Sequence, residues 1–284
     1  MIPGSFDYQR AASIDDAIAR LVAAGGGGKF IAGGHSLVPL MKLRLAEPAV
    51  LVDLGRIPGF GFVRERGDVI EIGAGTTHHE LATSSLLRER CPALAEAAAG
   101  IGDQQVRNRG TIGGSLAHAD PSADLPAVVV ALDADVDVRG PEGSRTVDAS
   151  SFFQGLMTVD LSPHELIVGI RIRPVRASAY AKLPQRASRY AVVGVAAALT
   201  MEGGVIREAR VCVTGATSHA TRLPAVESRL AGKAPTPAAI DEAAANAGER
   251  LADVNVDIHA SEAYRRAMVA VFTKRALTAA ASKT

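Results

Sequence analysis

The chain has 284 residues, of which 48% are hydrophobic and 21% are charged. This composition is typical of a globular protein with a sizeable core, and it excludes a disordered or low-complexity chain. With 31 Lys and Arg against 30 Asp and Glu, the net charge is +1, which excludes the basic surface that nucleic-acid binding requires. The longest apolar stretch, at 191–199, is too short to span a membrane.

The two cysteines, Cys91 and Cys212, are far apart in the chain, and neither belongs to a C-x-x-C motif. A four-thiolate iron–sulfur cluster therefore cannot be built from this sequence, and we expect both thiols to be small buried side chains in a reducing compartment. The first residues show neither the basic nor the apolar region of a secretory signal. These features predict a cytoplasmic protein.

The first 54 residues predict a helix followed by a strand, a glycine turn, a helix and a strand. Ser13 is a favourable N-cap, and the apolar residues after it recur at helical spacing up to the glycine run at 25–28. The elements expected next are a strand at 30–32, a glycine turn at 33–36, a helix from Ser36 to about Leu45 and a strand at 50–54.

Residues 62–172 combine strand and helix patterns. A hairpin is predicted at 62–73, because Arg66-Gly67-Asp68 can supply its turn. The other elements expected here are helices at 84–90 and 92–99, an extended segment at 106–109, a second glycine turn at 111–115, an apolar run at 125–132, a hairpin at 135–146 and a strand at 165–172.

The remainder of the chain predicts strands first and helices later. Strands at 190–201 and 205–214 flank a glycine turn, and helices are expected at about 224–231, 237–251 and 261–280. This order indicates an α+β layer rather than a doubly wound parallel sheet.

A polar stretch after Pro174 marks the predicted domain boundary. We therefore predict an α+β protein with a first domain at 1–176 and a second, smaller domain at 177–284. The first domain is expected to consist of two lobes, at about 1–55 and 56–176.

The glycine pairs Gly33-Gly34 and Gly113-Gly114 carry the main functional signal. Glycine has no Cβ, so its backbone amides can approach an anion closely, and the start of a helix adds further amides. Two such segments converging on a diphosphate would hold both of its charged groups. Each pair alone is also compatible with an ordinary tight turn, and neither belongs to a G-x-G-x-x-G or P-loop motif.

Three motifs show a family resemblance: AGGHSL at 32–37 followed by PLMK at 39–42, RNRGTIGGS at 107–115, and DPSAD at 120–124. Together they resemble the FAD-binding medium subunit of aerobic carbon monoxide dehydrogenase and of related xanthine dehydrogenase-type molybdenum hydroxylases. The resemblance implies an FAD-binding domain of the vanillyl-alcohol oxidase-like (PCMH) type, followed by a small C-terminal flavoprotein domain. It also implies non-covalent FAD.

The resemblance assigns cofactor contacts but no catalytic acid or base, since the flavin carries the chemistry. Two segments would hold the diphosphate, Asp124 would accept a bond from a ribose hydroxyl, and an apolar pair would line the flavin or adenine pocket. The residues so assigned are Ala32, Gly33, Gly34, His35, Ser36, Thr111, Ile112, Gly113, Gly114, Ser115, Asp124, Leu166 and Ile167. For Leu166 and Ile167, the alternative is that they are ordinary core residues of a strand.

The segment from Lys182 to Ala191 resembles the family pattern K-x3-R-x3-Y-A, which assigns Lys182 to cofactor binding and places Tyr190 near the isoalloxazine ring. Many relatives have Asp where this chain has Arg189, and many have Asn where it has Ser115. These departures leave the substrate and the electron acceptor open, but not the cofactor.

The resemblance also implies partners: a small subunit with [2Fe-2S] clusters and a large molybdopterin subunit, assembled as a dimer of heterotrimers, that is, a heterohexamer. Electrons would pass from the iron–sulfur subunit to FAD and then to a quinone or another acceptor. Carbon monoxide is the first choice of substrate for the complex, with N-heterocycles, aldehydes and purines as alternatives. The complex would be cytoplasmic, either free or held at the inner face of the membrane.

Two other functions remain as alternatives, a self-contained oxidase with FAD linked to His35 and a flavin-binding assembly module without turnover. A metal site receives no support, because His78 and His79 would point to opposite sides of an extended chain. His118, close in sequence to Asp120 and Asp124, fits a turn and a ribose contact better than a metal or acid–base site.

Overall fold

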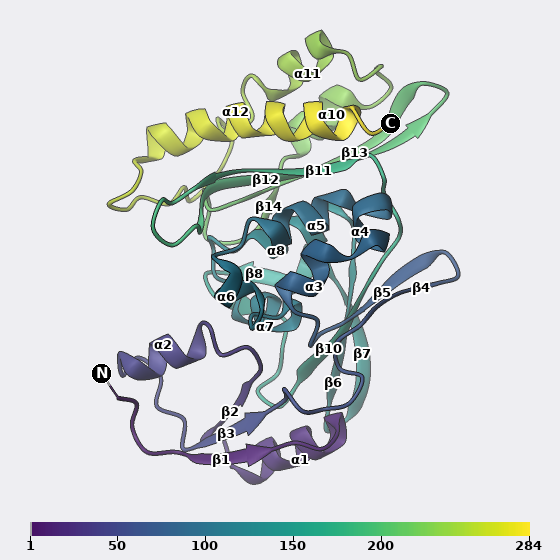
Figure 1. The fold of residues 1–284 in the computed structure, drawn as a ribbon. Coiled ribbons are helices and arrows are strands. Elements are labelled where there is room, and N and C mark those ends of the chain that lie inside the picture. The colour runs from purple at the N-terminus through teal and green to yellow at the C-terminus, as the bar shows by residue number, and fades with distance from the viewer. Residues whose placement is uncertain (1) are drawn as a thin grey trace.

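The computed structural model describes residues 2–284 as three stacked parts (Figure 1). The N-terminal lobe holds a small sheet in the order β1-β3-β2, in which both pairings are parallel. Helix α1 begins where predicted, since the Ser13 hydroxyl accepts a hydrogen bond from the amide of Asp16 at 3.1 Å. The elements of this lobe are β1 (Asp7–Arg10), α1 (Ile14–Ala23), β2 (Gly28–Ile31), α2 (Leu37–Lys42) and β3 (Val50–Asp53).

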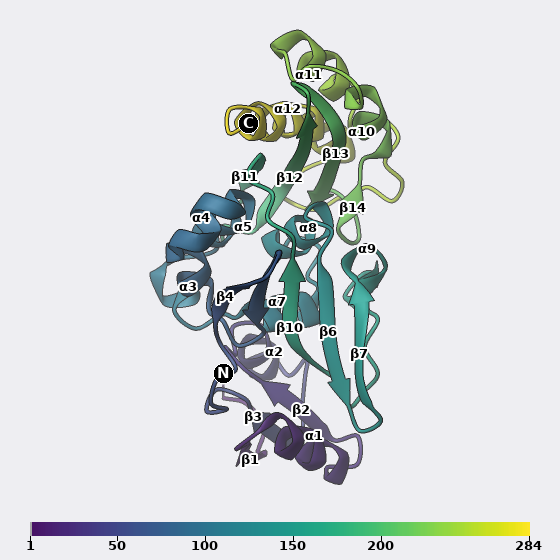
Figure 2. The same ribbon diagram turned by 90° about the vertical axis from the view of Figure 1, so that its right-hand side faces the viewer.

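The central lobe is built on a five-stranded antiparallel sheet in the order β4-β5-β10-β6-β7 (Figure 2). Its strands are β4 (Val63–Arg66), β5 (Val69–Gly73), β6 (Asp135–Gly140), β7 (Gly143–Asp148) and β10 (Leu166–Ile172). Its helices are α3 (His78–Thr83), α4 (Ser85–Arg90), α5 (Pro92–Ala99), α6 (Gln104–Arg107), α7 (Ile112–His118), α8 (Asp124–Ala131) and α9 (Ala149–Phe152). A short hairpin adds β8 (Phe153–Gly155) and β9 (Thr158–Val159).

The C-terminal part is a four-stranded sheet in the order β11-β12-β13-β14. Helix α12 contacts β11 and β12 from one side, while α5 and α8 of the central lobe contact the same strands from the other side (Figures 1 and 2). The elements are β11 (Ser178–Pro184), β12 (Ala191–Glu202), β13 (Val205–Thr214), β14 (Thr221–Arg222), α10 (Pro224–Leu230), α11 (Pro237–Ala244) and α12 (Glu262–Ala281).

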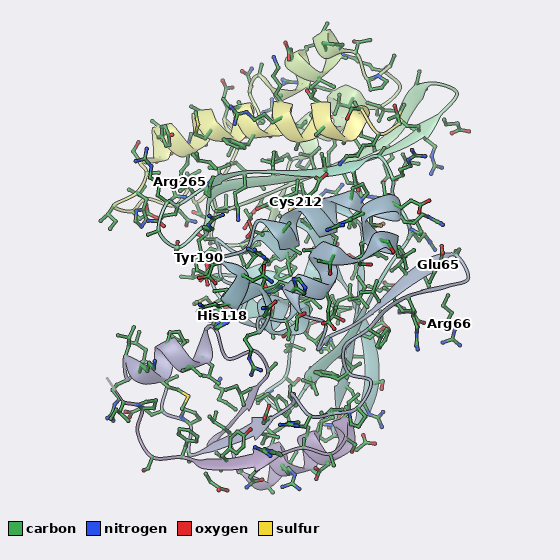
Figure 3. The ribbon with its side chains drawn as sticks, viewed as in Figure 1. Glu65, Arg66, His118, Tyr190, Cys212 and Arg265 are labelled. Carbon is green, nitrogen blue, oxygen red and sulfur yellow. The ribbon has the colours of Figure 1, made fainter. Side chains whose placement is uncertain are left out.

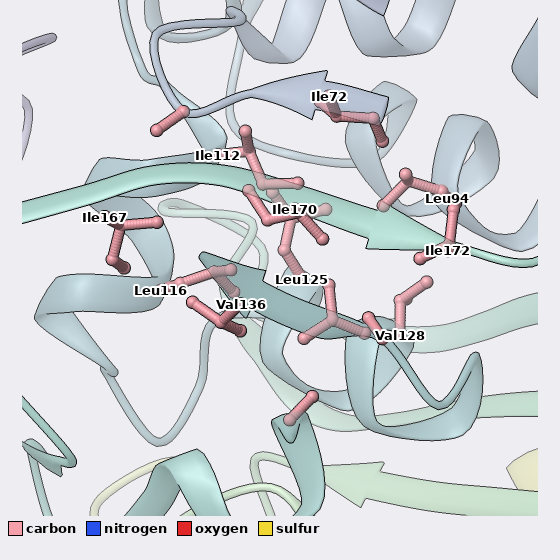
Figure 4. Close-up of a cluster of buried hydrophobic side chains, with 14 of the residues drawn as sticks. Ile72, Leu94, Ile112, Leu116, Leu125, Val128, Val136, Ile167, Ile170 and Ile172 are labelled. Carbon is pink, nitrogen blue, oxygen red and sulfur yellow. The ribbon is translucent and has the colours of Figure 1, made fainter. Parts of the chain in front are cut away.

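Two hydrophobic clusters form the core. The first runs through the N-terminal and central lobes and includes Ile170 and Val136 (Figure 4). It also takes in Ala196 from β12, whereas its neighbours Val195 and Ala197 belong to the second cluster, beneath α12. Strand β12 is therefore buried on both faces, which explains why its sequence is continuously apolar.

Both cysteines are buried, as expected. Burial raises the pKa of the Cys91 thiol to about 11, and it raises the pKa of the Cys212 thiol further. No helix within residues 2–284 has the length and apolar character needed to cross a membrane.

The structure differs from the sequence-based reasoning at several local points. The segment predicted as extended at 106–109 falls partly in helix α6, because the Asp103 side chain caps that helix by accepting from the Val106 amide at 2.9 Å. His78 and His79 lie in helix α3, which a Thr77–Glu80 capping box starts, and not in an extended segment. The predicted helix at 237–251 ends earlier, at Ala244.

The second glycine turn is also different from the expectation. Gly113 and Gly114 lie in the first turn of helix α7, whose N-cap is Thr111. The helix predicted to run to about Leu45 ends at Lys42 and is followed by Arg44 with a positive φ of 60°.

Candidate functional site

A cleft of about 720 Å³ separates the N-terminal lobe from the central lobe and extends to the loop between β11 and β12. This volume is within the range of cofactor and ligand sites. Thirteen of the fifteen residues assigned from the sequence line the cleft: Ala32, Gly33, Gly34, His35, Ser36, Thr111, Gly113, Gly114, Ser115, Asp124, Leu166, Ile167 and Tyr190. The structure thus brings together segments that are far apart in the chain.

The first glycine segment, 32–37, leaves β2 at the floor of the cleft. Within residues 2–284, the backbone amides of five consecutive residues, Gly33 to Leu37, donate to no acceptor. Gly34 has a positive φ of 76°, which a residue with a Cβ rarely adopts. The Ser36 hydroxyl makes no capping bond to α2. This segment therefore offers a row of unused donors to an anion, which is the chemistry that a diphosphate requires.

The second glycine segment, 110–115, has no such row. The amides of Ile112 and Gly113 donate to the carbonyl oxygens of Thr76 and Ala74 at 3.0 and 2.9 Å. The Gly114 amide donates to the Thr111 hydroxyl at 3.1 Å, and the Ser115 amide donates to the Thr111 carbonyl oxygen. What this segment presents to the cleft is the exposed Gly114 backbone and the Ser115 hydroxyl, which has no hydrogen-bond partner within residues 2–284.

The two segments touch, and glycine makes this contact possible. A Cβ on Gly33 would collide with the backbone of Arg109 and Gly110. A Cβ on Gly113 would lie 2.6 Å from the Cβ of Ala74, whereas one on Gly114 would meet only the Thr111 hydroxyl, at 2.9 Å. Gly33 and Gly113 therefore serve close packing of the backbone, and Gly114 is the glycine whose open side faces the cleft.

His78 supports the second segment from below. Its amide donates to the Gly110 carbonyl oxygen at 2.9 Å, and its ring lies where a Cβ on Gly110 would be. Burial, with the nearby His35 as a smaller cause, lowers the pKa of His78 to about 4. The imidazole is therefore neutral at physiological pH, and no positive charge from His78 is available to a diphosphate.

One end of the cleft carries Tyr190, on the same side of the molecule as His118 (Figure 3). Tyr190 is 42% exposed. Burial of its hydroxyl and the charge of Asp120 raise its pKa, while the Ser36 hydroxyl beside it acts in the opposite direction. Tyr190 thus lies in the cleft beside Ser36 of the first glycine segment, and its partly exposed ring is available to a planar group.

Residues 161–167 form another part of the cleft lining. Leu166 and Ile167, both mostly buried, line the cleft there together with Leu161. Arg145 fixes the adjoining loop by donating from Nε and Nη2 to the two carboxylate oxygens of Glu165, each at 2.7 Å. This pairing lowers the pKa of Glu165 to about 2. The apolar side chains of Leu161, Leu166 and Ile167, beside this firmly held loop, suit contact with a flat heterocycle such as adenine.

Comparison with known proteins identifies the family. Residues 4–175 match the model described as the FAD binding domain in molybdopterin dehydrogenase, and residues 178–280 match the CO dehydrogenase flavoprotein C-terminal domain. The chain is 41% identical to the carbon monoxide dehydrogenase medium chain of Hydrogenophaga pseudoflava, over 99% of this chain and 98% of that one. It is 36% identical to the nicotine 6-hydroxylase medium subunit of Paenarthrobacter nicotinovorans, over 98% of both chains.

The chain belongs to the family of FAD-binding subunits of molybdopterin dehydrogenases. A solved carbon monoxide dehydrogenase from Hydrogenophaga pseudoflava, which lacks the Mo-pyranopterin moiety, matches with a TM-score of 0.94 at 40% identity, covering 100% of this chain and 99% of that one. Quinoline 2-oxidoreductase from Pseudomonas putida 86 matches with a TM-score of 0.92 at 32% identity, covering 99% of each chain. The predicted family, α+β class, FAD cofactor and oxidoreductase function are confirmed.

Two of the assigned residues of this FAD subunit lie outside the cleft lining. Ile112, the first residue of α7, is fully buried in the core. Lys182 lies behind the cleft wall, where its ammonium donates three hydrogen bonds to protein oxygens. Asp124 does line the cleft, but its two carboxylate oxygens already accept bonds from Tyr180 and Lys182. The ribose contact assigned to Asp124 therefore remains a prediction.

Sequence reasoning missed several parts of the site. His78 and the carboxylate of Asp120 border the cleft, as do Gly102 and Val106 around helix α6. The Thr77–Glu80 capping box and the Asp103 cap were readable signals for the helices that bring these residues to the cleft. No local signal indicates the bonds from 74–76 to the second glycine segment, because they join parts of the chain that are distant in sequence.

Proposed function

We propose that this chain binds one FAD non-covalently in the cleft and serves as the electron-transfer subunit of a molybdenum hydroxylase complex. The observation that carries this proposal is the row of unpaired amides from Gly33 to Leu37, lying in a cleft of a size that suits a cofactor, in a chain matched end to end by FAD subunits. When bound, FAD supplies the ability to accept electrons singly or in pairs and to pass them on.

The chain's own residues would bind and orient the cofactor. The amides of the first glycine segment would donate to the diphosphate, with the Ser36 hydroxyl beside them. Gly114 and the Ser115 hydroxyl would contact the other side of the cofactor. Leu166 and Ile167 would contact the adenine, and Tyr190 would then lie near the isoalloxazine ring. No acid or base of the protein is required.

The partners follow from the relatives. The relatives are named as medium subunits or chains of dehydrogenases and hydroxylases, which implies that their complexes contain further subunits. We place a [2Fe-2S] subunit and a molybdopterin subunit beside this chain, in a dimer of heterotrimers in the cytoplasm. The acceptor would be a quinone, which would hold the complex at the inner face of the membrane, or another oxidant. The domain division at 1–176 and 177–284 is part of the same proposal.

Carbon monoxide is the proposed substrate of the complex, because two carbon monoxide dehydrogenase medium chains match the whole chain at 41% and 39% identity. The relative from Paenarthrobacter nicotinovorans with 36% identity acts, by its name, on nicotine, and one from Sulfolobus acidocaldarius with 32% identity acts on glyceraldehyde. An N-heterocycle or an aldehyde is therefore the alternative.

The test measures flavin in the purified chain and its reduction in the assembled complex. About one FAD per chain, released into the supernatant by acid precipitation, is expected; flavin retained on a peptide containing His35 would support the covalent oxidase instead. Carbon monoxide should bleach the flavin absorbance only when the iron–sulfur and molybdopterin subunits are present. Bleaching of the isolated chain by carbon monoxide would show that the partner subunits are not needed for flavin reduction. Bleaching of the complex by nicotine but not by carbon monoxide would show that an N-heterocycle is the substrate.

A further inference from the structure

Lys182 is a buried cation with all of its donors in use. It lies on β11, and its side chain is 8% exposed. Its ammonium donates to the Gly100 carbonyl oxygen at 2.8 Å, to Oδ2 of Asp124 at 2.9 Å and to the Arg189 carbonyl oxygen at 2.9 Å. An ammonium has three protons, so no donor is left for a cofactor phosphate or hydroxyl.

The carboxylate of Asp124 holds this cation in place. The side chain of Asp124 is 4% exposed, and its other oxygen, Oδ1, accepts a bond from the Tyr180 hydroxyl at 2.5 Å. Tyr180 and Lys182 are two positions apart on β11, so both face the central lobe. Gly194, opposite Lys182 on β12, leaves the space that the Tyr180 hydroxyl occupies. Burial raises the pKa of Asp124, and the ammonium of Lys182 opposes that shift.

The third bond of Lys182 reaches the loop that carries Tyr190. Arg189 has a positive φ of 62°, which is uncommon for a residue with a side chain. The bond from Lys182 to the Arg189 carbonyl oxygen fixes the peptide plane between Arg189 and Tyr190. The Tyr190 carbonyl oxygen accepts from the Gln185 amide at 2.8 Å, and the next amide, that of Ala191, donates to the Ser122 carbonyl oxygen at 3.1 Å.

We propose that Lys182, held by Asp124, is a positioning residue that sets the orientation of Tyr190 at the ring end of the cleft, and that it controls the reactivity of the bound flavin rather than its affinity. The inference rests on the proposed function, because it places the ring beside Tyr190. Lys182 spans three segments that meet there: the end of α5 at Gly100, the start of α8 at Asp124, and the β11–β12 loop. Loss of its ammonium would remove the bond that ties the Arg189–Tyr190 peptide to α5 and α8, while leaving the first glycine segment intact.

The test compares Lys182→Met with Tyr190→Ala in the full chain. Lys182→Met is expected to retain its FAD and to change the rate of flavin reoxidation by an external acceptor by at least about twofold, the low end of couplings within one hydrogen-bond network. In the Tyr190→Ala background the same change should have no further effect. Lys233→Met, at an exposed ion pair with Glu242, is the matched control and should leave the rate unchanged.

Two further variants keep the proposal falsifiable if Lys182→Met, with Asp124 left uncompensated, fails to fold. Lys182→Met/Asp124→Asn removes both charges and should reproduce the altered rate with FAD retained. Asp124→Asn alone keeps the bonds from Lys182 to Gly100 and Arg189. Its rate of flavin reoxidation should therefore differ less from that of the natural chain than the rate of the double variant does. Loss of FAD in the double variant but not in Asp124→Asn alone would overturn the positioning role. So would rate effects of Lys182→Met and Tyr190→Ala that multiply independently.

A measurement without FAD separates this inference from the proposed function. The chain has four tyrosines, so fluorotyrosine labelling gives few signals, and the ¹⁹F resonance of Tyr190 can be assigned by its loss in Tyr190→Phe. Lys182→Met/Asp124→Asn should shift or broaden that resonance, while Lys233→Met should not. An unchanged resonance would refute the positioning role even if the chain binds FAD as proposed, and absence of FAD from the natural chain would refute the proposed function alone.

Discussion

The first glycine segment, 32–37, and the second, 110–115, look alike in sequence but differ in what their backbones can do. Five consecutive amides of the first, from Gly33 to Leu37, have no acceptor within residues 2–284. In the second, the amides from Ile112 to Ser115 are all bonded within the protein. The first segment is therefore built to receive an anion, and the second is built to support the wall against which the ligand lies.

The difference comes from the neighbours of each segment. The second segment runs beside residues 74–78, whose carbonyl oxygens take its first amides, and Thr111 caps helix α7. The first segment leaves the end of a short parallel sheet, and the Arg109–Gly110 backbone that packs against Gly33 takes none of its amide bonds. A glycine pair thus gives conformational freedom, and the surrounding chain decides whether that freedom serves a ligand or packing.

The largest expected effect is that of Gly33→Ala. A Cβ at this position collides with the backbone of Arg109 and Gly110, so the first segment must move away together with its free amides. Overpacking of this kind costs up to about 3 kcal/mol, which would weaken FAD binding about 100-fold. Fluorescence titration of the apoprotein with FAD measures it. Gly155→Ala, where a Cβ would have open space, is the control. If Gly33→Ala bound FAD as tightly as the natural chain, the first segment would not be the one that receives the diphosphate.

His78 gives the second segment a pH dependence. Its folded-state pKa is about 4, below the ordinary value of 6.5, so the unfolded chain binds a proton in this range that the folded chain does not. The stability that this provides is fully present above pH 6.5 and is lost as the pH falls. Between pH 6.5 and 5 its contribution to the free energy of unfolding should drop by about 1.5 kcal/mol.

Urea unfolding at a series of pH values tests this expectation. Between pH 6.5 and 5, the free energy of unfolding of His78→Gln should fall by about 1.5 kcal/mol less than that of the natural chain. His259→Gln, at an exposed position, is the control. Equal pH dependence in the natural chain and in His78→Gln would show that this histidine takes up its proton at the same pH in the folded and unfolded states.

Thr111→Val removes the cap of helix α7 without changing side-chain shape. The loss of the bond from the Gly114 amide should destabilise the chain by about 1 kcal/mol. FAD affinity should change by less than about twofold, because this hydroxyl serves the helix. Thr236→Val, which removes the cap of the distant α11, should cost a similar amount of stability in the same urea titration. A tenfold loss of affinity confined to Thr111→Val would show that the second segment binds the diphosphate directly.

Ser115→Ala is expected to have the smallest effect. Its hydroxyl lines the cleft and has no hydrogen-bond partner within residues 2–284. One hydrogen bond is worth about 0.5–1.5 kcal/mol, so FAD affinity should fall about threefold, with stability unchanged. Isothermal titration of the apoprotein measures the change, with the exposed Ser228→Ala as control. A loss as large as that of Gly33→Ala would reverse the roles of the two segments.

The sequence predicted what is set locally. The hairpins at 62–73 and 135–146, the capped helix after Ser13 and the helix–strand order of the C-terminal part are all present, because their turns and caps depend on neighbouring residues. The cleft position of both glycine pairs was also predictable. The bonding of the second pair to 74–76, the fully used ammonium of Lys182 and the neutral His78 were not, because each depends on residues brought together only by folding.

The buried cysteines have a practical consequence for following the β11–β12 loop. Thiol reagents react with the thiolate, and both Cys91 and Cys212 are enclosed and hold their protons at neutral pH. The folded natural chain should therefore not react with maleimide dyes or nitroxide labels. A single cysteine introduced at the exposed Ser188 would be the one reactive thiol of this chain. If the chain is labelled before it is assembled with its partners, the loop beside Tyr190 could be observed without removing any native residue from the core.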